Sequence, residues 1–267
     1  MRLSSLFRPA LIGGLLASAV LVSAQADEIR VLSAGAIEPG LRAAAAAFDR
    51  QTGHVTTLTF NTAPALRRRM GLGLGLGLEA GTPVPEAAFD VVIAPPAVLG
   101  EFADAGKLAE GRANVGRVGM GVTVRDGAPV PDISSPEALQ QAVLAADSLV
   151  FNRASTGLYF EGLLKKMGID ARVEAKTTRY PDGAAVLEHV MTGKGREVGF
   201  AAMTEILLYQ GKGLRLVGPL PAAVQNYTAY RAAPLVSSPR AALAQQFVAF
   251  LAGPVAKPLL AAAGVTE

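Results

Sequence analysis

The sequence contains no cysteine and no tryptophan, and aromatic residues make up only 6% of its 267 positions. Without cysteine, the chain can form neither a disulfide nor a lipid-modified cysteine at its N-terminus. A chain of this length can be stabilised by its hydrophobic core alone, even outside the cytoplasm. The scarcity of aromatic residues, together with abundant alanine and glycine, favours closely packed α/β layers over an all-β sandwich.

The sequence also lacks the residue patterns typical of metal-binding sites and of serine hydrolases. Histidine occurs only as His54 and His189, and neither lies in a spaced His/Glu cluster. We therefore expect no metal site and no other cofactor. The sequence has no Gly-x-Ser-x-Gly segment, which argues against a serine hydrolase of the α/β type.

One long hydrophobic run lies near the start of the chain. Arg2 and Arg8 make a positive segment, residues 10–22 are uncharged, and residues 23–26 (Ser-Ala-Gln-Ala) place alanines at both positions of an A-x-A site. This order is typical of a secretory signal peptide, and the run is too short for a membrane span. We expect a signal peptide over 1–26, cleavage after Ala26, a periplasmic protein, and no membrane span in the mature chain.

Charge gives little indication of a macromolecular partner. Cleavage removes Arg2 and Arg8, so the 25 basic residues fall to 23, against 22 acidic residues. This near balance does not provide the basic surface that nucleic-acid binding requires. No nucleic-acid partner is expected.

Short apolar runs followed by turns and helical segments recur along the mature chain, a pattern typical of a parallel sheet covered by helices. Pro39 and Pro136 suit first helical turns, Ser135 suits an N-cap, and Gly53 suits a helix end. The pattern predicts strands at 29–34, 55–60, 89–94, 118–124, 148–151, 173–176, 198–201 and 214–217, and an extended stretch at 225–230. It predicts helices at 39–52, around 66–69, at 97–105, 136–146, 155–168, 184–191, 239–251 and 254–263.

A Gly-Leu dipeptide repeat occupies residues 71–78. It contains no G-x-G-x-x-G, and no Gly-Lys-Ser/Thr follows it, so neither phosphate-binding motif is present. It also precedes a predicted strand instead of joining a strand to its helix. We interpret it as a low-complexity loop or an extension of the preceding helix.

The order of elements indicates two α/β lobes with a cleft between them. An α/β half is followed by a second one, and residues 218–221 (Gly-Pro-Leu-Pro) then suggest a return to the first. The predicted division is 27–118 plus 222–267 for lobe 1, and 119–221 for lobe 2.

Several sequence blocks in this order resemble the periplasmic substrate-binding proteins of ABC importers, in the branch that contains the molybdate-binding proteins. The blocks are VLSAGA at 31–36, TFNTAPAL at 59–66, FDVVI at 89–93, STGLY at 155–159, VGF at 198–200 and FVAFLAGPVAK at 247–257. The resemblance covers essentially the whole mature chain. It implies the fold of a type II periplasmic binding protein, with two Rossmann-like lobes that close over a small anionic ligand. It also implies transient contact with an ABC permease, and we expect a monomer.

The resemblance also indicates where a ligand would bind. In the molybdate branch, small polar side chains and helix N-termini hold the oxyanion, because unpaired N–H groups and the helix dipole favour negative charge. By position, the two serines that hold the oxyanion in the family correspond to Ala36 and to a residue near Ala63, beside Thr62. The tyrosine of the family site corresponds to a residue near Ala202. The backbone donors fall around Thr156 and at Gly183-Ala184. Most side-chain donors of a molybdate site are therefore missing, while the anion-binding architecture is retained.

The expected turns carry other polar groups instead. The candidate ligand-binding residues are Ala36, Asn61, Thr62, Ala63, Arg67, Asn152, Arg153, Ser155, Thr156, Arg179, Tyr180 and Gly183. Arginine pairs in bidentate fashion with carboxylates, so several arginines would suit a di- or tricarboxylate. For Arg153 and Arg179 a solvated lobe surface or an ion pair between the lobes is an equal alternative, and for Arg68 and Arg69 it is the favoured interpretation.

An enzymatic alternative remains open, because aconitate isomerase is a related member of this branch. Moving a double bond requires a group that takes and returns a carbon-bound proton, and cations for the substrate carboxylates. The candidates are Glu38, Tyr180, Asp182 and Glu205. For Glu38 and Asp182 a capping role at a helix N-terminus is the favoured interpretation.

Overall fold

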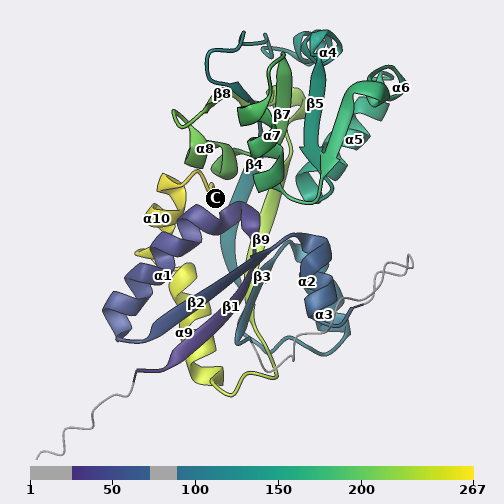
Figure 1. The fold of residues 1–267 in the computed structure, drawn as a ribbon. Helices are drawn as coiled ribbons and strands as arrows, with labels where there is room; N and C mark the ends of the chain where they lie inside the picture. Colours follow the sequence, from purple (N-terminus) through teal and green to yellow (C-terminus); the bar gives the residue numbers. More distant parts are fainter. Residues whose placement is uncertain (1–25, 73–88) are drawn as a thin grey trace, which may run out of the picture.

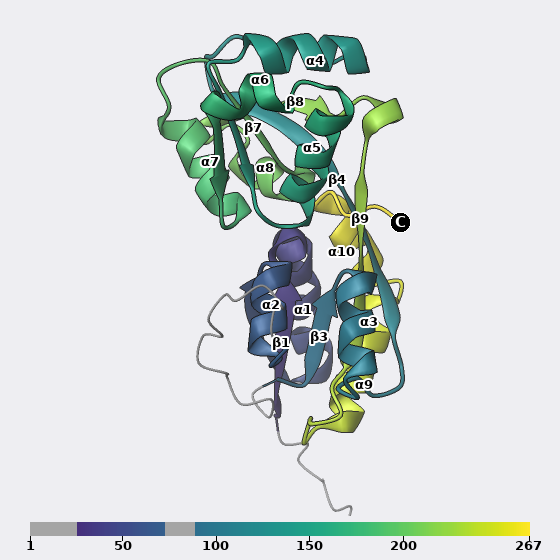
Figure 2. The ribbon, with the colours of Figure 1, turned by 90° about the vertical axis from the view of Figure 1, so that its right-hand side faces the viewer.

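The computed structural model describes residues 26–72 and 89–267. The predicted signal peptide, apart from Ala26, and the Gly-Leu repeat from residue 73 on lie outside the described residues. Within them, the chain forms two α/β lobes that Figures 1 and 2 show one above the other. The predicted fold class is confirmed.

Lobe 1 is built on a mixed sheet in the order β2-β1-β3-β9-β4. Its strands are β1 (Glu28–Ala34), β2 (Val55–Asn61), β3 (Val91–Ala94), β9 (Tyr227–Pro234) and the first part of β4 (Ala113–Arg125). β1 lies parallel to β2 and β3, whereas β9 runs antiparallel to β3 and β4. All residues of β3, and those of β1 from Val31 on, are buried, as a sheet covered on both sides requires.

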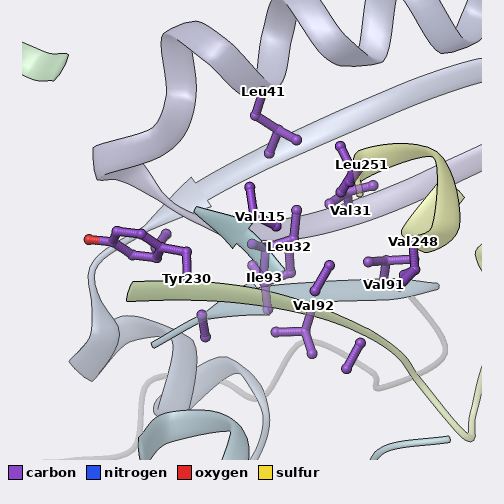
Figure 3. Packing of buried hydrophobic residues seen from close by; sticks show 14 of the residues in the cluster. Val31, Leu32, Leu41, Val91, Val92, Ile93, Val115, Tyr230, Val248 and Leu251 are labelled. Carbon is purple, nitrogen blue, oxygen red and sulfur yellow. The ribbon is translucent and has the colours of Figure 1, made fainter. Parts of the chain in front are cut away.

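Five helices cover this sheet: α1 (Glu38–Thr52), α2 (Ala63–Arg69), α3 (Pro96–Asp104), α9 (Ala241–Leu251) and α10 (Ala256–Ala262). A short 3-10 turn, η1 (Gly35–Ile37), joins β1 to α1. Gly53 ends α1 in the left-handed conformation, with φ of 76°, as glycine allows. Figure 3 shows Leu41 of α1 and Leu251 of α9 packed over Val31 and Leu32 of β1.

Lobe 2 uses the second part of β4, with β7 (Glu197–Ala202), β5 (Ser148–Asn152) and β6 (Thr177–Tyr180); β8 (Leu214–Pro219) pairs with β4 on its other side. Its helices are α4 (Pro136–Ala145), α5 (Ser155–Lys166), α6 (Asp170–Val173), α7 (Gly183–Thr192) and α8 (Met203–Tyr209), with 3-10 turns η3 (Glu174–Lys176) and η4 (Ala222–Val224) at its edges. Buried side chains form two further clusters in this lobe.

β4 connects the lobes, since residues up to Gly119 pair with β9 and residues from Met120 pair with β7 or β8. The hydrophobic clusters change at the same place: Val118 belongs to the lobe 1 cluster and Met120 to a lobe 2 cluster. The C-terminal segment meets this junction, because Arg117 and Thr266 exchange backbone hydrogen bonds of 2.7 and 2.9 Å. The lobe boundaries given above remain a proposal.

Several predicted elements agree with the structure. Ser135 caps α4, because its hydroxyl accepts a hydrogen bond from the N–H of Ala138. Asp182 caps α7 in the same way, with the N–H of Ala185 as donor at 3.0 Å. Both helices therefore begin where their capping residues predict.

The structure differs from the prediction at several elements, among them α6, which was not predicted. The strand expected at 173–176 is instead the end of α6 and the turn η3, and β6 begins at Thr177. The apolar/polar alternation of Val173 to Lys176 misled the prediction, because four residues are too few to distinguish a strand from a turn. β4 begins at Ala113, five residues before the predicted strand, and α8 was not predicted at all.

In the described residues, no single helix is long and apolar enough to cross a membrane. α9 and α10 meet that criterion only when they are taken together, although they are bent by 57° at their junction.

Candidate functional site

A cavity of about 460 Å³ lies between the two lobes and is lined by residues from both. Its wall includes the first turns of three longer helices: Glu38 and Pro39 of α1, Ser155 and Thr156 of α5, and Gly183 with Ala184 of α7. The positive dipole ends of these helices meet at one space, and the starts of α5 and α7 also bring backbone N–H groups there. At the start of α1, Pro39 has no N–H and the N–H of Glu38 donates to the carbonyl of Gly35. Such an arrangement favours an anion.

Most of the residues predicted from the sequence are brought together at this cavity. Those in its wall are Ala36, Asn61, Thr62, Ala63, Asn152, Ser155, Thr156 and Gly183, together with the enzymatic candidates Glu38, Asp182 and Glu205. Ala202, to which the family's tyrosine was carried over, is not in the wall; it is buried directly before α8.

Three of the predicted residues lie outside the cavity wall because they are engaged elsewhere. Arg67 forms a bidentate pair with Glu101 of α3, at 2.6 and 2.7 Å. Arg179 pairs with Glu174 and Glu161 in lobe 2. The hydroxyl of Tyr180 lies 2.9 Å from Nδ1 of His189.

Arg153 is also absent from the wall, and its side chain is exposed. Its backbone N–H donates to the carbonyl of Tyr180, which fixes the turn but leaves the guanidinium outside. The structure therefore places none of the three predicted arginines at the cavity.

The arginine in the cavity wall is Arg68, for which a solvated lobe surface or an ion pair between the lobes was the favoured interpretation. Successive residues of a helix point about 100° apart, so Arg67 reaches α3 while Arg68 faces the cavity. The side chain of Arg68 is half-buried and forms no ion pair or hydrogen bond with any other described residue. The sequence shows three consecutive arginines at 67–69, but it does not show which of them faces the cavity.

Asn61 supplies a second unpaired donor. It ends β2 in the cavity wall, and its Nδ2 is buried without a hydrogen-bond partner in the described structure. A buried N–H group without a partner costs free energy, which a bound acceptor would recover. Arg68 and Asn61 therefore offer a positive charge and a free donor on the lobe 1 side.

Asn152, in the same wall, stabilises the turn that leads into α5. Its Oδ1 accepts hydrogen bonds from the N–H groups of Ala154 and Gly157, at 3.0 and 3.1 Å. A side chain on Gly157 would place its Cβ 1.6 Å from the carbonyl oxygen of Asn152. Asn152 and Gly157 together shape the tight turn that brings the start of α5 to the cavity.

Three carboxyl groups complete the wall. Glu38 pairs with Arg42 one helical turn later in α1, at 2.8 Å, and Asp182 caps α7. Asp182 therefore caps its helix as predicted, whereas Glu38 lies in the first turn of α1 and pairs with Arg42. Glu205, the third carboxyl group, has no basic partner among the described residues.

Glu205 differs from the other two in its surroundings. Burial raises the pKa of Glu205 to about 7, and the negative charges of Asp182 and Glu38 act in the same direction, against a hydrogen bond from the Ala202 backbone. Burial, with a smaller effect of Glu205, likewise raises the pKa of Tyr230, which is only 4% exposed. This cavity thus holds a carboxyl group that changes charge near neutral pH.

The position of Glu205 depends on α8 and on Gly183. A Cβ on Gly183 would lie 2.2 Å from Oε2 of Glu205, and one on Gly35 would lie 4.0 Å from Oε1. The hydroxyl of Thr204 donates to the carbonyl of Ala36 in lobe 1, which ties α8 to the start of α1. Figure 1 shows α8 at the level where the lobes meet.

The described residues include no group of three histidine, cysteine, aspartate or glutamate side chains arranged to hold a metal ion.

The profile of the bacterial extracellular solute-binding protein family matches residues 29–266. The chain belongs to this family. The solute-binding protein is 28% identical over 241 residues to an aconitate isomerase from a Pseudomonas species, a match that covers 89% of this chain and 87% of that one.

Solved structures with the same fold are named for different ligands. The periplasmic molybdate-binding protein of Azotobacter vinelandii superposes with a TM-score of 0.71 and 18% identity, covering 90% of this chain and 99% of that one. PEB3 with bound L-phospholactate superposes with a TM-score of 0.66 and 11% identity, covering 90% and 99%. At these identities the similarity shows the fold, and the ligand has to be inferred from the cavity.

Proposed function

We propose that this solute-binding protein captures a small organic anion with two or more carboxylates in the cavity between its lobes. The observation that carries the proposal is the guanidinium of Arg68, which pairs with no described residue and shares a wall with the starts of α1, α5 and α7. A cavity of about 460 Å³ falls in the range of small-molecule sites. Arginine and helix N-termini are the protein groups best suited to carboxylates.

The same wall is poorly suited to a compact inorganic oxyanion. Ala36 and Ala63 stand where the molybdate branch has hydroxyl donors, so a tetrahedral dianion would lose two hydrogen bonds. It would also lie close to the carboxyl groups of Glu38, Asp182 and Glu205. A longer anion can place its carboxylates at Arg68 and the helix starts, and present other atoms to the acidic side. The phospholactate bound by PEB3 is a precedent for an organic anion in this fold.

A thermal-shift panel of citrate, cis-aconitate, trans-aconitate, molybdate, tungstate and sulfate tests the proposal. A ligand at 100 times its dissociation constant adds about 2.7 kcal/mol of stability. For a protein of this size that raises the Tm by several degrees. The proposal requires such a shift from at least one carboxylate; a shift from molybdate or tungstate alone would contradict it.

We further propose that the protein is periplasmic and delivers its ligand to an ABC permease. Membership of the extracellular solute-binding family supports both statements, as does the predicted signal peptide over 1–26. Binding of the ligand-loaded protein to its permease in proteoliposomes, and its absence with ligand-free protein, is the corresponding test.

A second candidate function is isomerisation of a small tricarboxylate such as aconitate. Two observations favour it: the 28% identity to an aconitate isomerase along most of the chain, and the location of Glu205 in an anion site. A carboxyl group with a pKa near 7 is well matched to taking and returning a proton at neutral pH. Arg68 would hold a carboxylate of the substrate.

Proton NMR of purified protein with cis-aconitate distinguishes the two candidates. An isomerase forms trans-aconitate and incorporates solvent deuterium at the carbon that exchanges its proton. A binding protein forms no trans-aconitate and incorporates no deuterium, whatever the protein concentration. The Glu205→Gln variant is the control, because a catalytic conversion has to disappear with the exchangeable carboxyl group.

A further inference from the structure

Glu205 occupies a space that the fold keeps open for it. The missing side chain of Gly183 makes room for Oε2, whereas a side chain on Gly35 would make only an ordinary van der Waals contact with Oε1. α8 begins immediately after β7, and Thr204 fixes this helix to Ala36 across the lobe junction. The carboxyl group is therefore held in the cavity wall by elements of both lobes.

The groups that face Glu205 are acidic or neutral. Glu38 comes from α1, Asp182 from the turn before α7, Tyr230 from β9, and Tyr209 from α8 itself. β4, β7 and β8, which also pack against α8, contribute no titratable side chain to the described cavity wall. Arg68 of α2 is the basic residue in the described wall, and it is not paired with Glu205.

An ionised Glu205 and a bound anion would therefore repel each other without a cation between them. The neutral acid avoids this repulsion and offers an O–H donor to an anion oxygen, as protonated carboxyl groups do in other apolar sites. Protonation requires one proton from solvent for each anion bound, and no other bond changes.

We propose that Glu205 enters the complex as a carboxylic acid that donates a hydrogen bond to the bound anion, so that ligand capture takes up a proton. This inference rests on the proposed anion site and specifies its chemistry. Affinity then falls as Glu205 ionises in the free protein, by about tenfold between pH 6 and pH 8. Capture is favoured where the surroundings are mildly acidic.

The first measurement needs no ligand. In protein with ¹³C-labelled glutamate side chains, the carboxyl resonance that disappears in Glu205→Gln is expected to titrate with a midpoint near pH 7. A midpoint below about pH 5, close to that of an ordinary glutamate, overturns the inference. Binding of a carboxylate would still uphold the proposed function in that case.

The second measurement is calorimetric titration with trans-aconitate and with citrate at about pH 8, in two buffers of different ionisation enthalpy. The probes are fully ionised at this pH, so a difference in heat reports protons taken up by the protein. We expect close to one proton for the wild type and none for Glu205→Gln, whose amide retains a donor at all pH values. Glu137→Gln, outside the cavity at the start of α4, is the matched control and should behave as the wild type.

Three outcomes overturn the proposal. One is wild-type binding without proton uptake, and another is equal uptake by Glu205→Gln. The third is the failure of both probes to bind in any buffer, which would refute the proposed tricarboxylate site as well. A misfolded Glu205→Gln protein would not remove the test, because the two-buffer comparison on the wild type stands alone.

Discussion

At the scale of single residues, three consecutive arginines in α2 have three different surroundings. Arg67 is bound to Glu101, Arg68 lines the cavity, and Arg69 does neither. Three arginines in a row predict a basic helix end. Which of them reaches the cavity depends on how α2 is rotated about its axis relative to α3. That rotation is set by the packing of Leu66 and Met70 in the core, a tertiary effect that local sequence does not contain.

The first prediction concerns Arg68→Gln. Removing the charge should weaken binding of a tricarboxylate at least tenfold, since hydrogen bonds to charged groups contribute about 1.5–3 kcal/mol. Arg69→Gln, one position along the same helix, is the matched control and should keep wild-type affinity. Calorimetric titration of both variants decides the point; an equal loss in both would show that Arg68 acts only through overall charge.

The second prediction concerns stability and Glu205. Its folded pKa of about 7 lies above the value of 4.5 for a free glutamate, so the folded state holds a proton that the unfolded state releases. The contribution of this group is fully present below pH 4.5 and is lost as the pH rises through 7. We therefore compare the free energy of unfolding of Glu205→Gln with that of the wild type. The difference should shift in favour of the variant by up to about 3 kcal/mol between about pH 4 and about pH 8.

Urea denaturation of both proteins at the two pH values measures this difference. Glu137→Gln again serves as the control, because its carboxyl group lies outside the cavity at the start of α4. The prediction is wrong if the difference in stability between Glu205→Gln and the wild type is the same at both pH values. Ionisation of Glu205 would then not destabilise the folded state.

At the scale of elements, the predictable helices were those with a local signal at their ends. Ser135 and Asp182 mark the starts of α4 and α7 by accepting a backbone hydrogen bond. α8 has no such signal: it follows β7 directly, and its N-cap, Ala202, has no side chain that can accept. The helix that carries Glu205 is defined by its contacts with α1, β4 and β8, which only the fold brings together.

The third prediction concerns the turn between β5 and α5. In Gly157→Ala the new methyl group would meet the backbone carbonyl of Asn152, which cannot move away as a flexible side chain can. We expect a loss of stability of about 3 kcal/mol, together with weaker ligand binding, because the start of α5 shifts. Thermal unfolding and titration measure the two effects.

Gly162→Ala, in the same helix, is the control for helix propensity. The position that its methyl group would take has no neighbouring atom within 4 Å, and alanine is favoured over glycine in a helix by about 1 kcal/mol. Its stability should be equal to the wild type or higher. Similar losses in both variants would mean that α5 tolerates no alanine, and that the Asn152 contact is not the cause.

At the scale of the whole molecule, the two-lobed α/β architecture was predictable from the recurrent strand–turn–helix order and from the blocks shared with the family. The cavity residues in the turns after strands were predictable for the same reason, as with Asn61 and Ser155. The ion pairs of Arg67 and Arg179 could not be predicted, because these arginines meet their glutamate partners only in the folded chain. The partners are Glu101 for Arg67, and Glu161 and Glu174 for Arg179.

The fourth prediction concerns export. The mature protein should begin at Asp27 when it is expressed with its full sequence in a Gram-negative host, since residues 1–26 have the order of a signal peptide. N-terminal sequencing of the periplasmic fraction measures this. Ala24→Tyr with Ala26→Tyr should abolish cleavage, whereas Ser23→Ala should not; an uncleaved wild-type protein would contradict the prediction.

The central claim is that the cavity between the lobes binds a small organic polycarboxylate and does so through Arg68. Calorimetric titration at about pH 6 of the wild type and of Arg68→Gln, each with trans-aconitate, citrate and molybdate, tests it most directly. We predict saturable binding of one tricarboxylate per wild-type chain, at least tenfold weaker binding by Arg68→Gln, and no comparable binding of molybdate. Molybdate bound more tightly than either tricarboxylate, or tricarboxylate affinity unchanged in Arg68→Gln, would contradict the claim.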